Sequence, residues 1–138
     1  MRLLITLFVL SGAPLSGQDQ VSYENRNQID YGPLSVRSVQ GRVTDGQGAL
    51  VPTVDIGVFT EADHKLVLSV VSDSEGRFSI AGLPKGNYRL VAHVDPFCTA
   101  NARIKVAKWP KGGLIRSRTL QVNIIPGGID KCSWISYK

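Results

Sequence analysis

The sequence predicts an all-β fold, a seven-stranded antiparallel Greek-key β-sandwich, and three observations lead to this prediction. Apolar and polar residues alternate over short runs, as they do in strands that turn one face toward a core. Gly, Pro, Asn and Asp separate these runs at frequent intervals and favour tight turns. No long segment keeps the spacing of an amphipathic helix. Short strands with frequent turns are typical of two antiparallel sheets packed face to face.

Seven runs carry the alternation along the chain. The expected strands cover residues 39–44, 53–60, 66–70, 77–80, 88–94, 102–106 and 120–124. In the third run, Leu66, Leu68 and Val70 are expected to face the core. In the fifth run Tyr88 is expected to face inward, and its hydroxyl then needs a partner such as a backbone carbonyl.

The N-terminus has the three-part pattern of a secretory signal peptide. A basic start precedes an apolar run that is too short to cross a bilayer, which needs roughly 20 apolar residues. Gln18 stands where a lipoprotein would carry its acylated Cys, which excludes a lipid anchor at this site. We therefore expect a secreted or periplasmic bacterial protein with no transmembrane span after cleavage. The expected organisation is a signal peptide at 1–17, a polar arm at 18–35, the sandwich domain at 36–126 and a tail at 127–138.

The formal net charge is +5, but the charged residues are distributed unevenly along the chain. Basic residues dominate the C-terminal part of the chain, where Asp130 is the only acidic residue after Asp95. The basic residues considered are Arg103, Lys105, Lys108, Lys111, Arg116 and Arg118. Such residues commonly lie on solvent-facing strand positions and protect sheet edges. The alternative is a patch for an anionic partner such as an acidic glycan or a lipid headgroup.

Two cysteines, Cys98 and Cys132, lie in loop-like segments of the exported part. An oxidising compartment permits a disulfide, and we expect these two residues to form one. Two separate buried thiols remain the alternative.

Catalytic and metal-binding motifs are sparse. His64 and His93 are the only histidines, and His93 with Asp95 falls short of the three or four ligands of a zinc site. Asp73 and Glu75 supply two carboxylates where calcium needs six to eight oxygens. No Gly-x-Ser-x-Gly nucleophile motif is present. We therefore expect no metal, no cofactor and no catalytic residues.

Three segments resemble the carboxypeptidase regulatory-like domain family. They are Gly41-Arg42-Val43-Thr44-Asp45 with Gly48, Ala49 and Val51-Pro52, then Asp73–Ile80, then Gly82–Leu90. The resemblance implies a transthyretin-like (prealbumin-like) sandwich, grouped with carbohydrate-binding-like folds, and an accessory module of exported bacterial proteins. The residues of this turn and core motif are Asp45, Gly48, Gly76, Phe78, Gly82, Leu83, Pro84, Gly86 and Tyr88. Gly76, Gly82 and Gly86 are expected to supply the backbone freedom of the turns.

The function expected from these observations is a non-enzymatic binding or interaction module. Its partner is expected to be a carbohydrate or an envelope protein and not a nucleic acid, and the oligomeric state is left open. Candidate ligand-binding residues are the loop aromatics Phe97, Trp109 and Trp134, which alternatively cap the ends of the core.

Two alternatives to this function stay open. One is a structural module that assembles through edge strands. The other is a small transthyretin-type hydrolase, although the chain ends in Trp134–Lys138 and not in the Tyr-Arg-Gly-Ser of 5-hydroxyisourate hydrolases. A hydrolase should place His64 or His93 within hydrogen-bond reach of a nucleophile or a second base.

Overall fold

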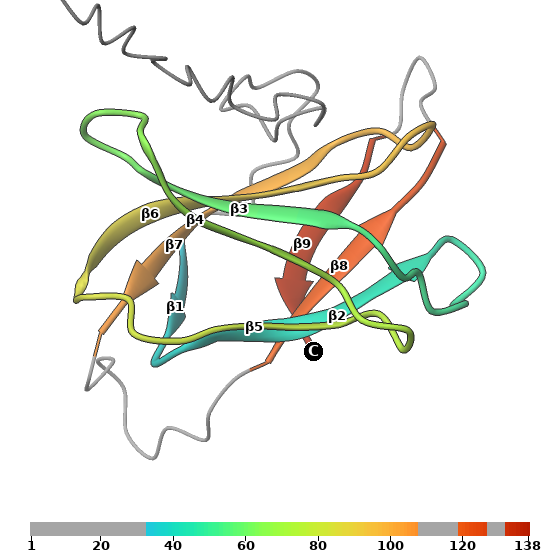
Figure 1. The fold of residues 1–138 in the computed structure, drawn as a ribbon, viewed down its shortest axis with the longest axis horizontal. Helices are drawn as coiled ribbons and strands as arrows, with labels where there is room; N and C mark the ends of the chain where they lie inside the picture. Colours follow the sequence, from blue (N-terminus) through green and yellow to red (C-terminus); the bar gives the residue numbers. More distant parts are fainter. Residues whose placement is uncertain (1–32, 108–118, 127–131) are drawn as a thin grey trace, which may run out of the picture.

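Two β-sheets packed face to face make up the part of the chain that the computed structural model describes, residues 33–107, 119–126 and 132–138 (Figure 1). The prediction of an all-β sandwich is therefore confirmed, with nine strands in these residues instead of seven. Their bounds are β1 (Leu34–Val36), β2 (Val39–Asp45), β3 (Asp55–Thr60), β4 (Leu66–Val71), β5 (Arg77–Ile80), β6 (Gly86–His93), β7 (Ala100–Val106), β8 (Leu120–Ile124) and β9 (Trp134–Tyr137). The described residues contain no helix that could cross a membrane.

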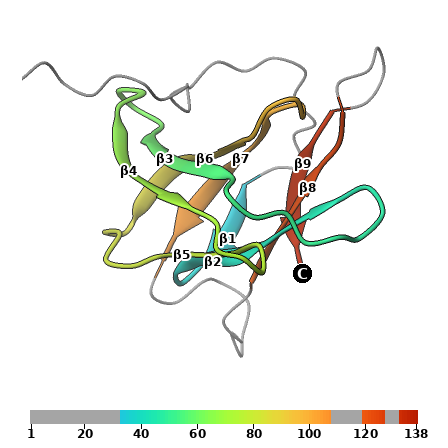
Figure 2. The same ribbon diagram turned by 45° about the vertical axis from the view of Figure 1, so that its right-hand side comes forward.

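The first sheet has the strand order β1-β7-β6-β3-β4, and the second has the order β5-β2-β8-β9. Figure 2 shows β4 at the outer margin of the first sheet. Most neighbouring strands are antiparallel, as expected, but β1 with β7 and β2 with β8 are parallel. The two parallel pairs join strands that are far apart in the sequence, so no local turn signal could have indicated their direction.

The sandwich extends beyond the expected limits of 36–126 at both ends. β1 begins inside the expected arm at 18–35, and β9 lies inside the expected tail at 127–138. The hydroxyl of Tyr137 in β9 accepts a hydrogen bond from the Ser35 amide in β1 at 2.6 Å and donates one to the Ser35 carbonyl at 3.3 Å. This pair links the two sheets along one side. The expected signal peptide at 1–17 lies outside the described residues.

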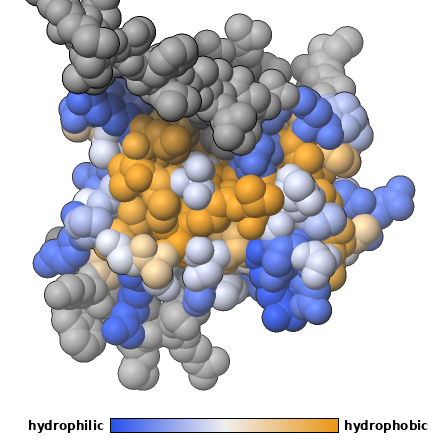
Figure 3. All heavy atoms as spheres, in the orientation of Figure 1, coloured by the Kyte–Doolittle hydropathy of each residue, from blue (hydrophilic) through white to orange (hydrophobic). Residues whose placement is uncertain are grey.

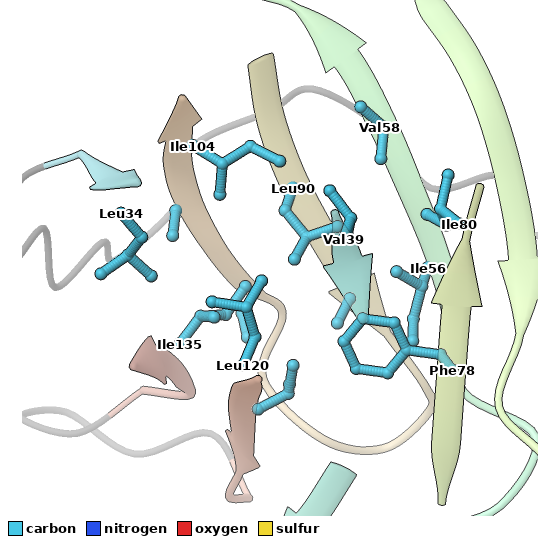
Figure 4. Close-up of a cluster of buried hydrophobic side chains, with 14 of the residues drawn as sticks. Leu34, Val39, Ile56, Val58, Phe78, Ile80, Leu90, Ile104, Leu120 and Ile135 are labelled. Carbon is cyan, nitrogen blue, oxygen red and sulfur yellow. The ribbon is translucent and has the colours of Figure 1, made fainter. Parts of the chain in front are cut away.

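The core lies between the sheets and consists mainly of Val, Ile and Leu side chains (Figure 4). The alternation predicted these positions well, since Phe78 and Ile80 are 5% and 1% exposed. Tyr88 is also buried, and its hydroxyl donates to the Pro84 carbonyl at 2.7 Å, which confirms the expected backbone partner. Leu83 packs against the same core. Burial of this apolar surface is the main stabilising term for a domain of this size.

The expected inward face of the third run is only partly inward. Val70 packs against the core, but Leu66 and Leu68 are 46% and 41% exposed. A bulge at Val67 breaks the alternation, so Leu68 lies opposite the core residue Val58, whereas Leu66 lies opposite Phe59 on the other face of the sheet. The pattern could show neither this bulge nor that β4 lies at the sheet margin, where the opposite sheet does not cover Leu68.

Two turns are stabilised in the same way, by an Asp carboxylate that accepts backbone amides. Asp45 Oδ1 accepts the amides of Gln47 and Ala49 at 2.8 and 2.9 Å, and Asp73 Oδ1 accepts two amides at 2.9 Å each. Gly76 and Gly82 have φ angles of 73° and 77°, as expected. Gly86 does not have a positive φ, because it is already the first residue of β6. In the first turn Gly48 has the positive φ, 82°.

Candidate functional site

A hollow of about 350 Å³ lies on the second sheet, where β2 and β5 run side by side. The side chains of Gln40, Arg42, Arg77 and Ser79 alternate with inward positions and point away from the sandwich interior, whereas the Phe78 side chain belongs to the core. The lining residues are Gln40, Gly41, Arg42, Asp73, Arg77, Phe78, Ser79, Thr119 and Lys138. Neither His nor Cys is among them, so this hollow offers polar and cationic groups but no histidine base.

The charges of the hollow are dominated by two arginines. Arg42 and Arg77 are directly opposite in the antiparallel β2–β5 pair, where like charges repel each other. Glu75 forms an ion pair with Arg77. The pKa of Asp73 is lowered from 3.8, first by the Arg77 amide that it accepts, then by the Glu75 amide and by the charges of both arginines. This arrangement can hold an anion, because two guanidinium groups face the same surface.

A second group of polar side chains lies where β6 ends and β7 begins. His93 is the last residue of β6 and points away from the core, on the face opposite Leu90, as expected. Its Nδ1 lies 2.9 Å from Thr99 Oγ1, and its Nε2 lies 3.3 Å from Asp95 Oδ1. The His93 side chain is 24% exposed and that of Asp95 is 72% exposed. A carboxylate, an imidazole and a hydroxyl therefore lie in series, with the imidazole hydrogen-bonded to the hydroxyl and in ion-pair contact with the carboxylate.

The residue before Thr99, Cys98, belongs to a disulfide that fixes the position of the Thr99 hydroxyl. Cys98 and Cys132 form the expected bond, with their Cα atoms 5.5 Å apart. Cys98 also donates its amide to the Ile125 carbonyl at 2.9 Å and accepts a hydrogen bond from the Ser133 hydroxyl. The Cys98 backbone, directly before Thr99, is therefore hydrogen-bonded to the segment that follows β8 and to the segment that precedes β9.

The predicted aromatic site is only partly within the described residues. Phe97 is half-buried, packs against the main core and forms an isolated bridge with Pro126. Trp134 is half-buried at the start of β9, opposite Asn123. Trp109 lies outside the described residues. The role of these aromatics in ligand binding stays a prediction.

The basic patch of the sequence prediction is described in part. Lys105 is exposed and Arg103 is half-buried, both on β7. The other four residues of that prediction, at 108, 111, 116 and 118, lie outside the described residues. Among the described residues, no group of three or more His, Cys, Asp or Glu side chains could hold a metal ion.

The model of the carboxypeptidase regulatory-like domain family matches residues 38–111, which is more than half of the chain. The chain belongs to this family. The match confirms the resemblance seen in the three sequence segments. No curated protein is similar enough to the chain to count as a match.

Two solved structures similar to this carboxypeptidase regulatory-like domain are named as enzymes. The Klebsiella pneumoniae 5-hydroxyisourate hydrolase is 19% identical with a TM-score of 0.50, and the match covers 73% of this chain and 95% of that one. An (S)-allantoin synthase structure is 15% identical with a TM-score of 0.44, and the match covers 75% of this chain and 45% of that one. A likeness at 19% identity shows the fold, which is transthyretin-like as expected.

The comparison corrects the functional prediction. A non-enzymatic binding or interaction module was expected. The solved hydrolase that shares the fold is an enzyme, so the fold gives no reason to exclude catalysis, and that expectation is contradicted.

Sequence reasoning identified part of the polar series and missed the rest. It paired His93 with Asp95 because the two are close in the chain. It missed Thr99, which the chain reaches only after the loop that contains Pro96. It also missed the hollow, although the outward positions of Arg42 and Arg77 in their alternating runs were a usable signal.

Proposed function

We propose that this domain is a small hydrolase in which His93 acts as a general base on the hydroxyl of Thr99. The observation that carries the proposal is the 2.9 Å contact between His93 Nδ1 and Thr99 Oγ1. That distance satisfies the geometric requirement for a base and its nucleophile. A hydrolase was expected to place His64 or His93 within hydrogen-bond reach of a nucleophile, and the contact of His93 with Thr99 meets this criterion.

Asp95 supports this role by favouring one tautomer of the imidazole. Its carboxylate lies 3.3 Å from Nε2, so its negative charge favours a proton on that nitrogen. The lone pair then stands on Nδ1, where it can accept the Thr99 hydroxyl proton. The order carboxylate, imidazole, hydroxyl is the logic of a nucleophile–base–orienting-group triad, with the two ring nitrogens exchanged relative to the serine protease arrangement.

The proposed reaction proceeds in two steps. In the first, Thr99 Oγ attacks the carbonyl carbon of an ester or amide while its proton moves to His93 Nδ1. The protonated imidazole gives this proton to the leaving alcohol or amine, and the acyl group stays on Thr99. In the second step, water loses a proton to His93 and attacks the acyl carbon. The carboxylic acid leaves, and the Thr99 hydroxyl regains the proton.

Hydrolysis by a protein of similar fold supports the choice of substrates for the test. The Klebsiella pneumoniae structure is named as a 5-hydroxyisourate hydrolase, so 5-hydroxyisourate is the first substrate to try. An activated ester such as p-nitrophenyl acetate and a cyclic amide such as hydantoin extend the panel to simple acyl transfer.

The test compares substitutions at His93 and Thr99 with a control at the other histidine. On any substrate that the wild type turns over, His93→Gln and Thr99→Val should each lower kcat/KM by about 10²- to 10⁴-fold. Thr99→Ser should retain activity because it keeps the hydroxyl. His64→Asn should leave activity unchanged, since His64 lies in an exposed turn with a φ of 56° that Asn adopts readily.

Three further variants test the orienting carboxylate and separate the proposed site from the hollow. Asp95→Asn should cost less activity than His93→Gln, because water can replace a carboxylate that is 72% exposed. Arg42→Gln and Arg77→Gln should leave the rate constant kcat unchanged. Full activity in His93→Gln would overturn the proposal. Loss of kcat confined to the two arginine variants would also overturn it, by placing the reaction in the hollow.

Export is the second part of the proposal. The Cys98–Cys132 disulfide supports an oxidising compartment, and the N-terminal sequence pattern of residues 1–17 supports a cleaved signal peptide. Expression of the full chain with fractionation and N-terminal sequencing tests this. A protein that stays in the cytoplasm with residues 1–17 attached would contradict it.

A further inference from the structure

The margin of the first sheet at β4 has the features of an interaction surface. β4 is the last strand in the order β1-β7-β6-β3-β4, and β3 is its only neighbour among the described strands. The amide and carbonyl groups of its outer side are therefore available to another strand. The other three sheet margins are β1, β5 and β9, which have three or four residues each, whereas β4 has six.

β4 lacks the usual protection of an edge strand. Its sequence LVLSVV contains no charge, Pro or Gly, although such residues commonly prevent association at sheet edges. Four of its side chains are 41% to 55% exposed. They are Leu66, Val67, Leu68 and Val71. In Figure 3 an apolar surface bordered by hydrophilic residues occupies the middle of the face on which Figure 1 shows β4.

The two sides of the sandwich differ in how they are closed. On the side of β1 and β9, the Tyr137 hydroxyl links the two sheets through Ser35. On the side of β4 and β5, Leu68 is exposed although it lies opposite the core residue Val58, and Leu66 is exposed on the other face. One protective feature is present, a bulge opposite Val58 and Phe59 that shifts the register near Leu66. The strand is regular from Leu68 to Val71.

The charges at the two ends of β4 identify a second copy of this chain as the occupant. Lys65 precedes the strand and Asp73 follows it after Ser72, and both charged residues are exposed. An antiparallel pair of β4 strands related by a two-fold axis at Ser69 brings the Lys65 end of each strand toward the Asp73 end of the other. A parallel pair would place like charges together at both ends, which is unfavourable. A two-fold axis gives the antiparallel arrangement and a closed dimer.

We propose that two copies of this chain associate through antiparallel pairing of their β4 strands, which joins their first sheets into one continuous sheet. The dimer satisfies the free backbone groups of both edges. It also brings the exposed Val67 and Val71 of the two copies together on one face. The proposal concerns a different surface from the proposed hydrolase site, so the two are tested independently.

Sedimentation equilibrium of the full chain tests the association with two variants of equal exposure. Val67 and Leu50 are both 44% exposed, but only Val67 lies on β4. The wild type should form a dimer at micromolar concentration. Val67→Lys should raise the dimer dissociation constant by about tenfold or more, because it places a charged ammonium group in the apolar contact with Val71 of the other copy. Leu50→Lys should leave it unchanged. A monomeric wild type at about 100 μM would overturn the proposal, since a weaker association is at most a transient contact. Equal effects of the two variants would do the same, by showing general hydrophobic association.

A crosslink tests the two-fold axis itself. In the proposed dimer the two Ser69 residues are opposite each other, at a Cα separation of about 4.5 to 5.5 Å that a disulfide can span. Ser69→Cys should therefore give a covalent dimer under mild oxidation, whereas Ser79→Cys on the exposed face of β5 should not. Lys65→Glu should weaken the dimer by opposing Asp73. Crosslinking of both cysteine variants to the same extent would contradict the proposed register.

Discussion

Gly76 should be the most sensitive glycine of the described turns, because its surroundings exclude a side chain. It has a φ of 73°, and a Cβ atom at this position would lie 2.6 Å from the Val43 carbonyl oxygen and 3.2 Å from the Val51 amide nitrogen. Both atoms belong to the backbone, so no side chain can rotate to make room. The Gly76 carbonyl also accepts the Val43 amide at 2.7 Å, so any displacement weakens that bond.

The magnitude follows from two separate costs. The left-handed conformation costs a non-glycine residue about 1 to 2 kcal/mol. Loss or distortion of the backbone hydrogen bond between Val43 and Gly76 adds about 1 to 3 kcal/mol. Gly76→Ala should therefore lower the free energy of unfolding by about 3 kcal/mol. Gly48→Ala should cost about 1 to 2 kcal/mol, since Gly48 has a φ of 82° but nothing lies within 4 Å of its added Cβ.

Urea denaturation followed by Trp fluorescence measures both free energies of unfolding. Gly76→Asn separates the two causes, because Asn adopts the left-handed conformation readily but still carries a Cβ atom. If the contact with Val43 dominates, Gly76→Asn should be nearly as destabilising as Gly76→Ala. Equal losses for alanine at positions 76 and 48 would refute the steric argument.

Two further predictions concern the disulfide and the Asp73 turn. Replacing Cys98 and Cys132 by Ser should lower the free energy of unfolding by about 4 kcal/mol, since the bond closes a loop with a sequence separation of 34; urea denaturation of the oxidised wild type and the double variant measures this. The loss should also appear as lower hydrolase activity, because Thr99 follows Cys98, and a fully active double variant would contradict that link. The folded pKa of Asp73 is below 3.8, so its stabilising effect is complete above this value and is lost as pH falls through the folded pKa. Asp73→Asn should therefore show a flatter dependence of unfolding free energy on pH below about 4 than the wild type, and parallel curves would rule out this contribution.

The strands that sequence could predict are those whose pattern is local. Phe78 and Ile80 alternate with polar neighbours, and both are buried. β1 and β9 lie in segments that were expected as an arm and a tail, where no alternating run was recognised. They form because β7 and β8 offer partners that are distant in the sequence, with Leu34 opposite Ile104 and Val122 opposite Ile135.

The turn chemistry was also readable because it depends on single residues. Gly76 and Gly82 adopt positive φ angles as expected, since only Gly does so without a steric cost. Gly86 shows the limit of this reasoning. The chain has already completed its reversal at that point, and Gly86 pairs with Val106 as an ordinary strand residue.

The candidate site was less predictable because its parts meet across a loop. The pair of His93 and Asp95 was visible in the sequence, because residues two positions apart can contact each other where the chain turns. Thr99 approaches the imidazole only because the chain reverses between β6 and β7 and the disulfide of Cys98 fixes the returning segment. A hydroxyl in an unremarkable loop carries no pattern that sequence alone could distinguish.

The exposure of β4 could not be predicted from the sequence either, because it depends on strands that are distant in the chain. Alternation assigns Leu66 and Leu68 to the core face, but the bulge at Val67 turns Leu66 to the face of Phe59, and Leu68 stays on the core side at an uncovered margin. Whether the face is covered depends on which strands lie beside and opposite it, and β4 has one neighbour in its sheet. In a single chain the leucine side chains of β4 are therefore exposed to water. Pairing of two β4 strands would shield them. If Val67→Lys gives a monomer as stable as the wild type, the apolar composition of β4 serves association and not the stability of the single sandwich.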